Sequence, residues 1–180
     1  GANDTYGGHF ALGQGTLNFK NGVKKTTSAN GIYSQTSGVT NISGGSSLIL
    51  NDANSQITGG TVNVTDNSEL GILNGKNNVS ELNVTGSNLS IKNNSTFTTT
   101  GGVVDSASVV EIEAGSKLKL NGDNAEVNLT KNDNTTGHIE VTNGNLYISD
   151  DLTKVTSETG TFVQTGGNTT LTGSNLVLAD

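Results

Sequence analysis

Residues Val62–Ile72 read VNVTDNSELGI, and residues Leu82–Ile91 read LNVTGSNLSI. The two stretches align when one residue is omitted from the first, and each begins and ends with apolar residues at positions i and i+2. Such alternation places both members of a pair on the same face of a β-strand. The two stretches therefore predict short strands in a unit that recurs about every 20 residues.

The same apolar pairs occur along most of the chain. No helical spacing is sustained, and Gly or Asn interrupts every window long enough for a helix. We therefore predict an all-β protein. The further pairs are Leu48/Leu50, Leu70/Ile72, Leu89/Ile91, Val110/Ile112, Leu118/Leu120, Val127/Leu129, Ile139/Val141, Leu146/Ile148 and Leu176/Leu178.

The spacing of the pairs predicts a right-handed parallel β-helix, or β-solenoid, with about nine coils of about 20 residues. One coil cannot bury its own apolar face, so neighbouring coils must stack to bury it. Thr-Gly-Gly at 58–60, 100–102 and 165–167 supplies residues suited to sharp corners. Asn-Gly, which occurs five times, also favours hairpins, so an antiparallel meander or β-sandwich remains the alternative.

We expect residues 1–180 to form one β-helix segment of a larger protein. Residues 1–36 hold four of the seven aromatic residues and less regular pairs, which suits either an N-terminal cap or irregular first coils. The final residues, VLAD, follow directly after a strong apolar pair. That position predicts that the sequence ends inside a longer array.

The amino-acid composition excludes several classes of protein and partner. Gly, Asn, Thr and Ser make up 94 of the 180 residues, but Val, Ile, Leu and Phe number 44, enough for an ordered protein with a thin core. The chain has no Cys, and therefore neither a disulfide nor a thiolate metal site. A net charge of −7 without Arg argues against nucleic acid as a partner. No apolar run approaches the ~20 residues of a membrane span, so we expect no membrane insertion of this segment.

Catalysis is not expected. His9 and His138 are the only histidines, and both are interpreted as solvated surface residues. Glu111 and Glu113 share an outward face, and Lys117 and Lys119 flank the next strand pair, which would suit an acid/base patch. Opposite charges on exposed strands are more often solubilising pairs. We therefore predict no enzyme, no catalytic or cofactor-binding residue and no cofactor.

Binding motifs are equally sparse. Residues 51–55 and 131–137 could offer oxygen ligands to calcium but fit turns better, so no metal-ligating residue is assigned. The threonine triplet 98–100 does not recur at the coil period, which disfavours an ice-binding array. No ligand-binding residue follows from the sequence. Several Asn residues stand in N-x-[ST] sequons that the composition alone explains: Asn41, Asn63, Asn83, Asn94, Asn128 and Asn168.

The repeats resemble the passenger regions of bacterial autotransporters, the pertactin-like and self-associating adhesins of type V secretion. The likeness covers most of the chain from about Gly38 and is compositional. It is carried by GGTVNVTDNSELGI at 59–72, LNVTGSNLSI at 82–91, IEVTNGNLYI at 139–148 and FVQTGGNTTLTGSNLVL at 162–178.

The resemblance implies an excised passenger fragment, secreted and held at the bacterial cell surface through a C-terminal barrel that this sequence lacks. It implies adhesion, either to another copy on a neighbouring cell, with aggregation and biofilm formation, or to a host glycan or matrix protein. Repeated Asn and Thr ladders along a flat side would sum many weak contacts. The alternatives are a structural stalk and, further off, a carbohydrate-active β-helix enzyme or phage-fibre piece.

Overall fold

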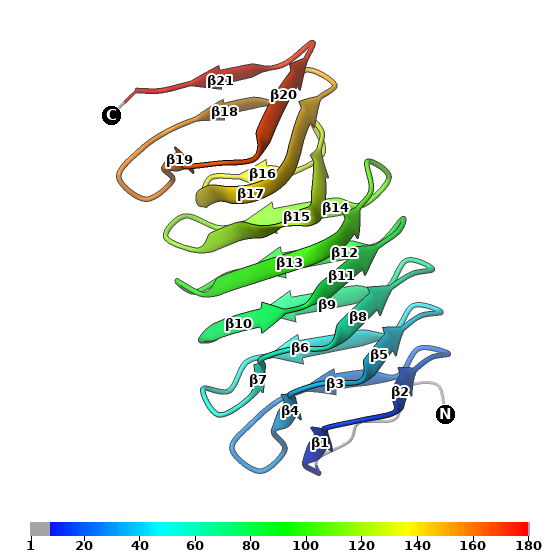
Figure 1. Ribbon diagram of the computed structural model, residues 1–180. Coiled ribbons are helices and arrows are strands. Elements are labelled where there is room, and N and C mark those ends of the chain that lie inside the picture. The colour runs from blue at the N-terminus through cyan, green and yellow to red at the C-terminus, as the bar shows by residue number, and fades with distance from the viewer. Residues whose placement is uncertain (1–7, 180) are drawn as a thin grey trace.

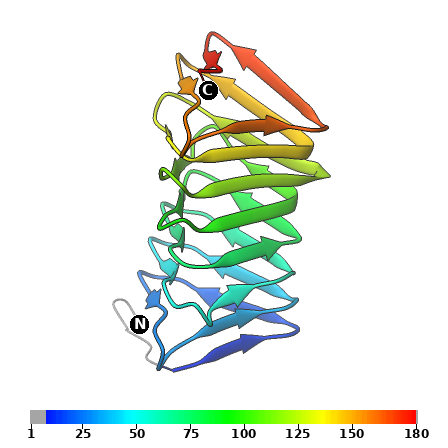
Figure 2. The same cartoon turned by 90° about the vertical axis from the view of Figure 1, so that its left-hand side faces the viewer.

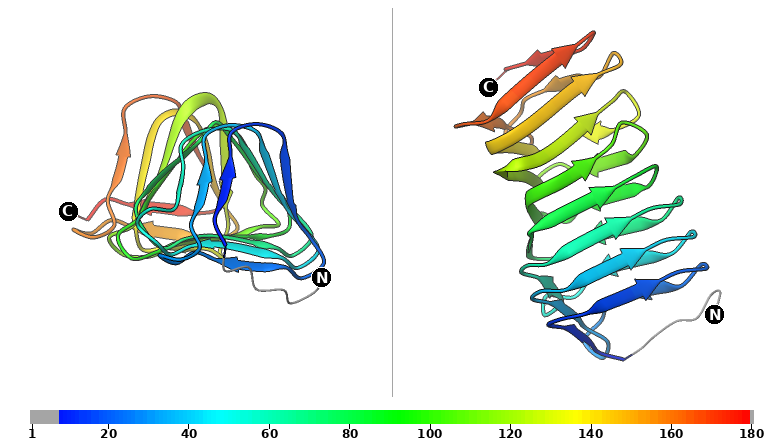
Figure 3. Two further views of the ribbon diagram at one scale, coloured as in Figure 1. Left: turned by 90° about the horizontal axis from the view of Figure 1, so that it is seen from below. Right: turned by 45° about the vertical axis from the view of Figure 1, so that its right-hand side comes forward.

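The structure is a computed structural model that describes residues 8–179. These residues form strands and no helix, and the strands stack into a solenoid of about eight turns with roughly 22 residues per coil (Figures 1 and 2). Seen from the N-terminal end, the chain runs clockwise as it recedes, which makes the solenoid right-handed, and its cross-section is triangular (Figure 3). The predicted fold class is confirmed.

Three flat faces, here called face 1, face 2 and face 3, follow one another around each coil. Face 1 holds β1 (Phe10–Leu12), β4 (Tyr33–Gln35), β7 (Gln56–Ile57), β10 (Lys76–Val79) and β19 (Phe162–Gln164). Face 2 holds β2 (Thr16–Phe19), β5 (Val39–Ile42), β8 (Thr61–Val64), β11 (Glu81–Val84) and β20 (Asn168–Thr172). The strands that run from face 1 around the corner into face 2 are β13 (Thr96–Val104), β15 (Lys117–Leu129) and β17 (His138–Ser149).

Face 3 is built of shorter strands and is divided into two sheets. Among the described residues, six strands form one sheet and the last two form another, with no pairing between β16 and β18. The strands of face 3 are β3 (Lys24–Thr26), β6 (Ser47–Leu50), β9 (Glu69–Ile72), β12 (Asn88–Ile91), β14 (Val109–Ile112), β16 (Asn134–Thr135), β18 (Thr153–Val155) and β21 (Asn175–Val177).

Every ladder between these strands is parallel, as in the pairing of Leu82 with Val62 and of Leu89 with Leu70. The antiparallel meander is therefore wrong for this chain. An isolated antiparallel bridge outside the named strands joins Ser28 and Gly31 within a corner. Because parallel strands need a crossover, each coil supplies one strand to each face before the chain returns to the same face.

The predicted apolar pairs form the core. From Leu48/Leu50 to Leu146/Ile148, all of them point inward with at most 1% of their surface exposed. Burying one such side chain stabilises the fold by about 1.5–3 kcal/mol. The last pair differs, because Leu176 is half-buried and Leu178 is 68% exposed in the final coil.

The Thr-Gly-Gly motifs lie at corners, as predicted. Gly60, Gly102 and Gly167 all have positive φ angles, which only glycine adopts without strain. At Gly102 a Cβ atom would also collide with the backbone of Leu82 in the preceding coil. Glycine at this corner therefore allows two coils to approach each other at normal ladder spacing.

The coils are longer and fewer than the sequence predicted. Leu82 pairs with Val62, at the interval that the central repeats display. Towards the two ends Phe10 pairs with Tyr33, and Ile139 pairs with Phe162, so the interval between partners is longer there. Longer corners in several coils account for the difference, including the coil between Val104 and Val127 in the middle of the solenoid.

Residues 1–36 were expected to form an N-terminal cap or irregular first coils. Residues 1–7 of this segment lie outside the described residues. Its described part supplies ordinary strands that pair with the next coil, β1 with β4 and β2 with β5. Three of its aromatic rings, those of Phe10, Phe19 and Tyr33, pack against one another in a tilted arrangement at centroid distances of 6.0 and 6.5 Å. Phe19 and Tyr33 are buried in the core of the first coils, as Phe97 is in a later coil.

No helix among residues 8–179 is long and apolar enough to cross a membrane.

Candidate functional site: the outer faces

A row of asparagines follows the outer surface of face 2. Parallel register places Asn18, Asn41, Asn63 and Asn83 above one another on four consecutive coils. The row continues through exposed Val103 and then Glu126, and returns to asparagine in the last two coils. Its eight positions are Asn18, Asn41, Asn63, Asn83, Val103, Glu126, Asn145 and Asn168.

Side-chain hydrogen bonds connect this asparagine row. The Nδ2 atoms of Asn41, Asn63 and Asn83 each donate to the Oδ1 atom one coil back, at 2.8, 2.8 and 2.9 Å. Asn168 donates to Asn145 in the same way at 3.1 Å. A carboxamide has two N–H donors and two acceptor lone pairs. Asn41 and Asn63 therefore each keep one donor and one acceptor for a partner outside the ladder.

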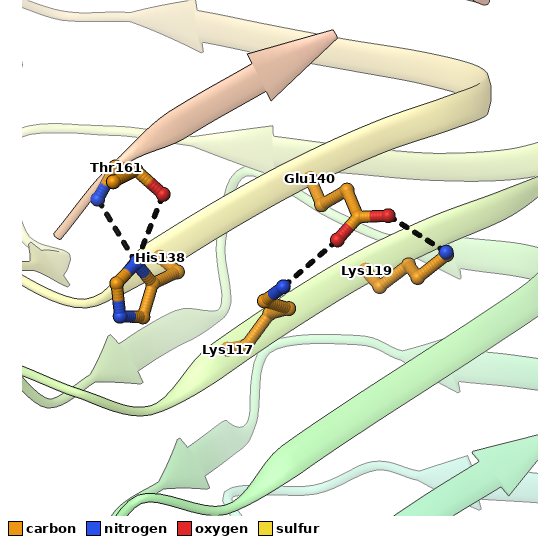
Figure 4. A network of polar contacts seen from close by, with 5 residues as sticks. All are labelled: Lys117, Lys119, His138, Glu140 and Thr161. Atoms are coloured by element: carbon orange, nitrogen blue, oxygen red, sulfur yellow. Dashed lines mark hydrogen bonds and ion pairs between the residues drawn. The ribbon is translucent and has the colours of Figure 1, made fainter. Parts of the chain in front are cut away.

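A charged network covers the outer surface of face 1 (Figure 4). Lys117 Nζ lies 2.9 Å from Glu140 Oε2, and Lys119 Nζ lies 2.7 Å from Glu140 Oε1. The hydrogen bonds from Lys119 and Lys117 hold the pKa of the Glu140 carboxyl below its usual value. Both lysines come from β15 and the glutamate from β17, so the network ties two neighbouring coils together.

His138 stands beside this network and is half-buried, not solvated as the sequence suggested. Its Nδ1 accepts a hydrogen bond from the backbone N–H of Thr161 at 3.1 Å and lies 2.9 Å from Thr161 Oγ1 (Figure 4). Burial, and then the charges of Lys117 and Lys154, lower the pKa of the imidazole. His138 therefore serves in its neutral form as an acceptor that holds the start of the last coil.

The structure does not assemble the acid/base patch considered from the sequence. Glu111 points outward on face 3, where its Oε2 lies 2.6 Å from Lys92 Nζ. Glu113 accepts a hydrogen bond from the backbone N–H of Asn93. Lys117 and Lys119 lie on face 1 and pair with Glu140. Lys119 and Glu140 are ladder partners, so they lie one coil apart along the sequence, and that separation was the sequence signal for their pairing.

The other candidates are also separated. His9 is exposed and lies in the first coil, where its Nδ1 accepts the N–H of Ile32 at 3.2 Å, whereas His138 begins β17. Residues 51–55 form a turn, as expected, whereas 131–137 include the two-residue strand β16. Within the part of the chain that the structure describes, no three His, Cys, Asp or Glu residues group as metal ligands would.

The threonine triplet does not present a flat array. Thr99 is buried and donates to the Gly101 carbonyl at 2.7 Å, while Thr98 and Thr100 are half-buried. Four of the sequon asparagines, Asn41, Asn63, Asn83 and Asn168, belong to the asparagine row.

No protein-family model, curated protein or solved structure matches this chain. The fold defines the class, a parallel β-solenoid with an apolar interior and polar outer faces. Its surface chemistry is that of repeated amides and hydroxyls, with a charged network on face 1.

Proposed function

We propose that the chain is a segment of an extracellular bacterial adhesin that acts side-on, by pairing with another copy of itself or by attaching to a host surface. The observation that carries the proposal is the asparagine row of face 2. A row of amides at ladder spacing offers the same donor and acceptor pattern on successive coils, so a second flat surface gains several contacts at once.

The core supports the same proposal. The buried core is formed by the inward residues, and the outer asparagines are not part of it. A ladder of four consecutive asparagines at one register costs β-propensity, since Asn is depleted in strands. A binding role gives a reason for that cost.

Sedimentation of the purified chain over a wide concentration range tests self-association. We expect reversible dimers or larger species, and we expect the double variant Asn41→Asp/Asn63→Asp to sediment as a monomer. Two new carboxylates on each copy would face those of the partner, and like charges brought together are unfavourable.

The matched control is Asn88→Asp, which adds a carboxylate at an exposed outward position of face 3. This variant should associate like the parent. Association lost equally in both variants would assign the effect to net charge and contradict a role for face 2. A parent chain that stays monomeric at all concentrations would contradict self-pairing and direct attention to host ligands or to a stalk.

A further inference from the structure

The strongest irregularity of the solenoid is the break in face 3 between β16 and β18. At the regular coil junctions of this face, the outward residues direct their backbone groups toward the preceding coil. Glu69 N–H donates to Ser46 at 3.0 Å, and Val109 N–H donates to Ser87 at 2.9 Å. The inward residues direct theirs toward the following coil.

At the break, the outward residues of β18 have no partner strand in the preceding coil. Thr153 and Val155 are the outward residues of β18, so their N–H and C=O groups point toward β16. The inward residues of the same coil do bond forward, since Asn175 N–H donates to Leu152 and Thr156 N–H donates to Val177. Within residues 8–179, no backbone ladder joins β18 to β16.

A lysine closes the inner side of the break. Lys154 points into the core with 1% exposure, and its Nζ donates to the carbonyls of Thr135, Gly137 and Gly160 at 2.7, 2.6 and 2.8 Å. One of these, the Thr135 carbonyl, belongs to β16 and would otherwise accept from a neighbouring strand. The lysine thus holds the two coils together without filling the space between the strands.

On the outer side the break is a cavity of about 390 Å³. This size lies at the lower end of ligand pockets, which span about 300–1,000 Å³. One wall is formed by β16 and its neighbours and the other by β18, so strand backbone lines both sides. The lining residues are Asp133, Asn134, Thr135, Thr136, Leu152, Thr153 and Val155.

We propose that this cavity binds a short extended peptide segment of a partner protein, which adds as a strand between β16 and β18. Strand addition uses the main-chain groups of an open sheet edge for affinity. Here the open edge of β18 faces β16, whose Thr135 carbonyl is occupied by Lys154 on the inner side. The partner segment is uncharged or basic, because the cavity contains the Asp133 carboxylate and the chain carries a net charge of −7. The inference does not depend on self-association through face 2.

The probe is a fluorescein-labelled peptide of alternating threonine and valine with one lysine at each end. We expect saturable binding to the full chain with a Kd below about 1 mM. The same peptide N-methylated at alternate residues lacks half of its donors and should bind at least tenfold more weakly. Equal binding of the two peptides would overturn strand addition.

Val155 allows a variant that removes a single donor at the break. Val155→Pro deletes the N–H that points into the cavity but leaves the β18–β21 ladder intact, because that ladder uses the inward residues, among them Leu152 and Thr156. Proline is tolerated where the N–H side of a strand is open. We expect unchanged secondary structure and at least tenfold weaker peptide binding. The control is Val155→Thr, which keeps the N–H and should bind the peptide like the parent. If Val155→Pro also bound the peptide like the parent, the proposal would be overturned.

Amide exchange tests the break itself, without any ligand. In the free chain the amides of Thr153 and Val155 should exchange much faster than that of Glu69, the equivalent outward position in a regular coil, and the peptide should slow them. Protection equal to that of Glu69 in the free chain would mean that the break is closed in solution, and the proposed site would not exist.

Discussion

Faces 2 and 3 are built from the same coils but differ in continuity. The inward row of face 2 runs through Ile42, Val64, Val84, Val104 and Val127 without a polar residue, and its sheet is unbroken.

The equivalent row of face 3 is apolar from Leu48 through Val110, but Asp133 follows, and in the next coil Lys154 points inward. A buried polar side chain must find hydrogen-bond partners. Asp133 accepts the Val110 N–H at 2.7 Å, and Lys154 donates to three carbonyls, so side chains replace the ladder. One inward lysine by itself does not interrupt the sheet, because Lys25 in β3 is buried and β3 still pairs with β6. The comparison teaches that an apolar inward row keeps neighbouring coils in register. Small buried serines such as Ser46 and Ser68 stack on successive coils without dividing the sheet, whereas the sheet divides where the two ionisable inward residues Asp133 and Lys154 follow each other.

The most severe way to break the continuous face is Leu82→Asp. Leu82 is 1% exposed on β11, and a carboxylate there would have neither a charge partner nor room for water. We expect a loss of about 5 kcal/mol in the free energy of unfolding, or a Tm lower by roughly 10–20 °C for a chain of this size. Thermal unfolding followed by circular dichroism measures it.

Asn88→Asp is the control for this variant, because it adds the same charge at an exposed position. It should change the free energy of unfolding by no more than about 0.5 kcal/mol. If Leu82→Asp melted like this control, the inward assignment of face 2 would be wrong.

A smaller effect is expected at the interrupted face from Lys154→Met. The methionine fills similar space but leaves the carbonyls of Thr135, Gly137 and Gly160 without their amine donor. We expect the free energy of unfolding to fall by about 3 kcal/mol. An unsatisfied buried polar group costs about 1–3 kcal/mol, and the three carbonyls share one donor. Chemical denaturation of parent and variant side by side measures it.

Lys119→Met makes the same replacement on the outer surface, where the lysine pairs with Glu140. Its cost should stay below about 1 kcal/mol. Equal losses in the two methionine variants would show that Lys154 does not hold the break together.

The smallest expected effect is a pH dependence at the last coil. Burial lowers the pKa of His138 in the folded chain below the ordinary value of 6.5, so the unfolded chain takes up a proton first as the pH falls. The contribution of neutral His138 is fully present above pH 6.5 and is lost as the pH falls through the folded-state pKa. Protonation also removes the acceptor for the Thr161 N–H.

His138→Gln should flatten this part of the stability profile, because glutamine keeps an acceptor and does not titrate. The measurement is the free energy of unfolding above and below the ordinary imidazole pKa for parent and variant. The exposed histidine provides the control, since His9→Gln should leave the slope contributed by His138 in place. A parent slope that survives in His138→Gln would refute the role of this residue.

The outcome at particular residues shows what sequence patterns can predict here. The pairs Val62/Val64 and Leu82/Val84 predicted both the strands and their inward faces, because period-two alternation maps directly onto the two sides of a strand. The full asparagine row was not visible in the sequence, because its register follows from coil lengths that vary along the solenoid. The pairing of Lys119 with Glu140 was missed for the same reason.

The sequence by itself determined the all-β class, the repeat and the inward apolar pairs, because period-two alternation at a regular interval maps directly onto stacked strands. The antiparallel alternative was excluded only by the parallel ladders of the structure. Tertiary structure alone decided which side chains meet across coils, because a change of one residue in a corner shifts every pairing above it. The asparagine row, the Glu140 network and the break between β16 and β18 all depend on that register. The proposed binding functions rest on the first and the last of these features.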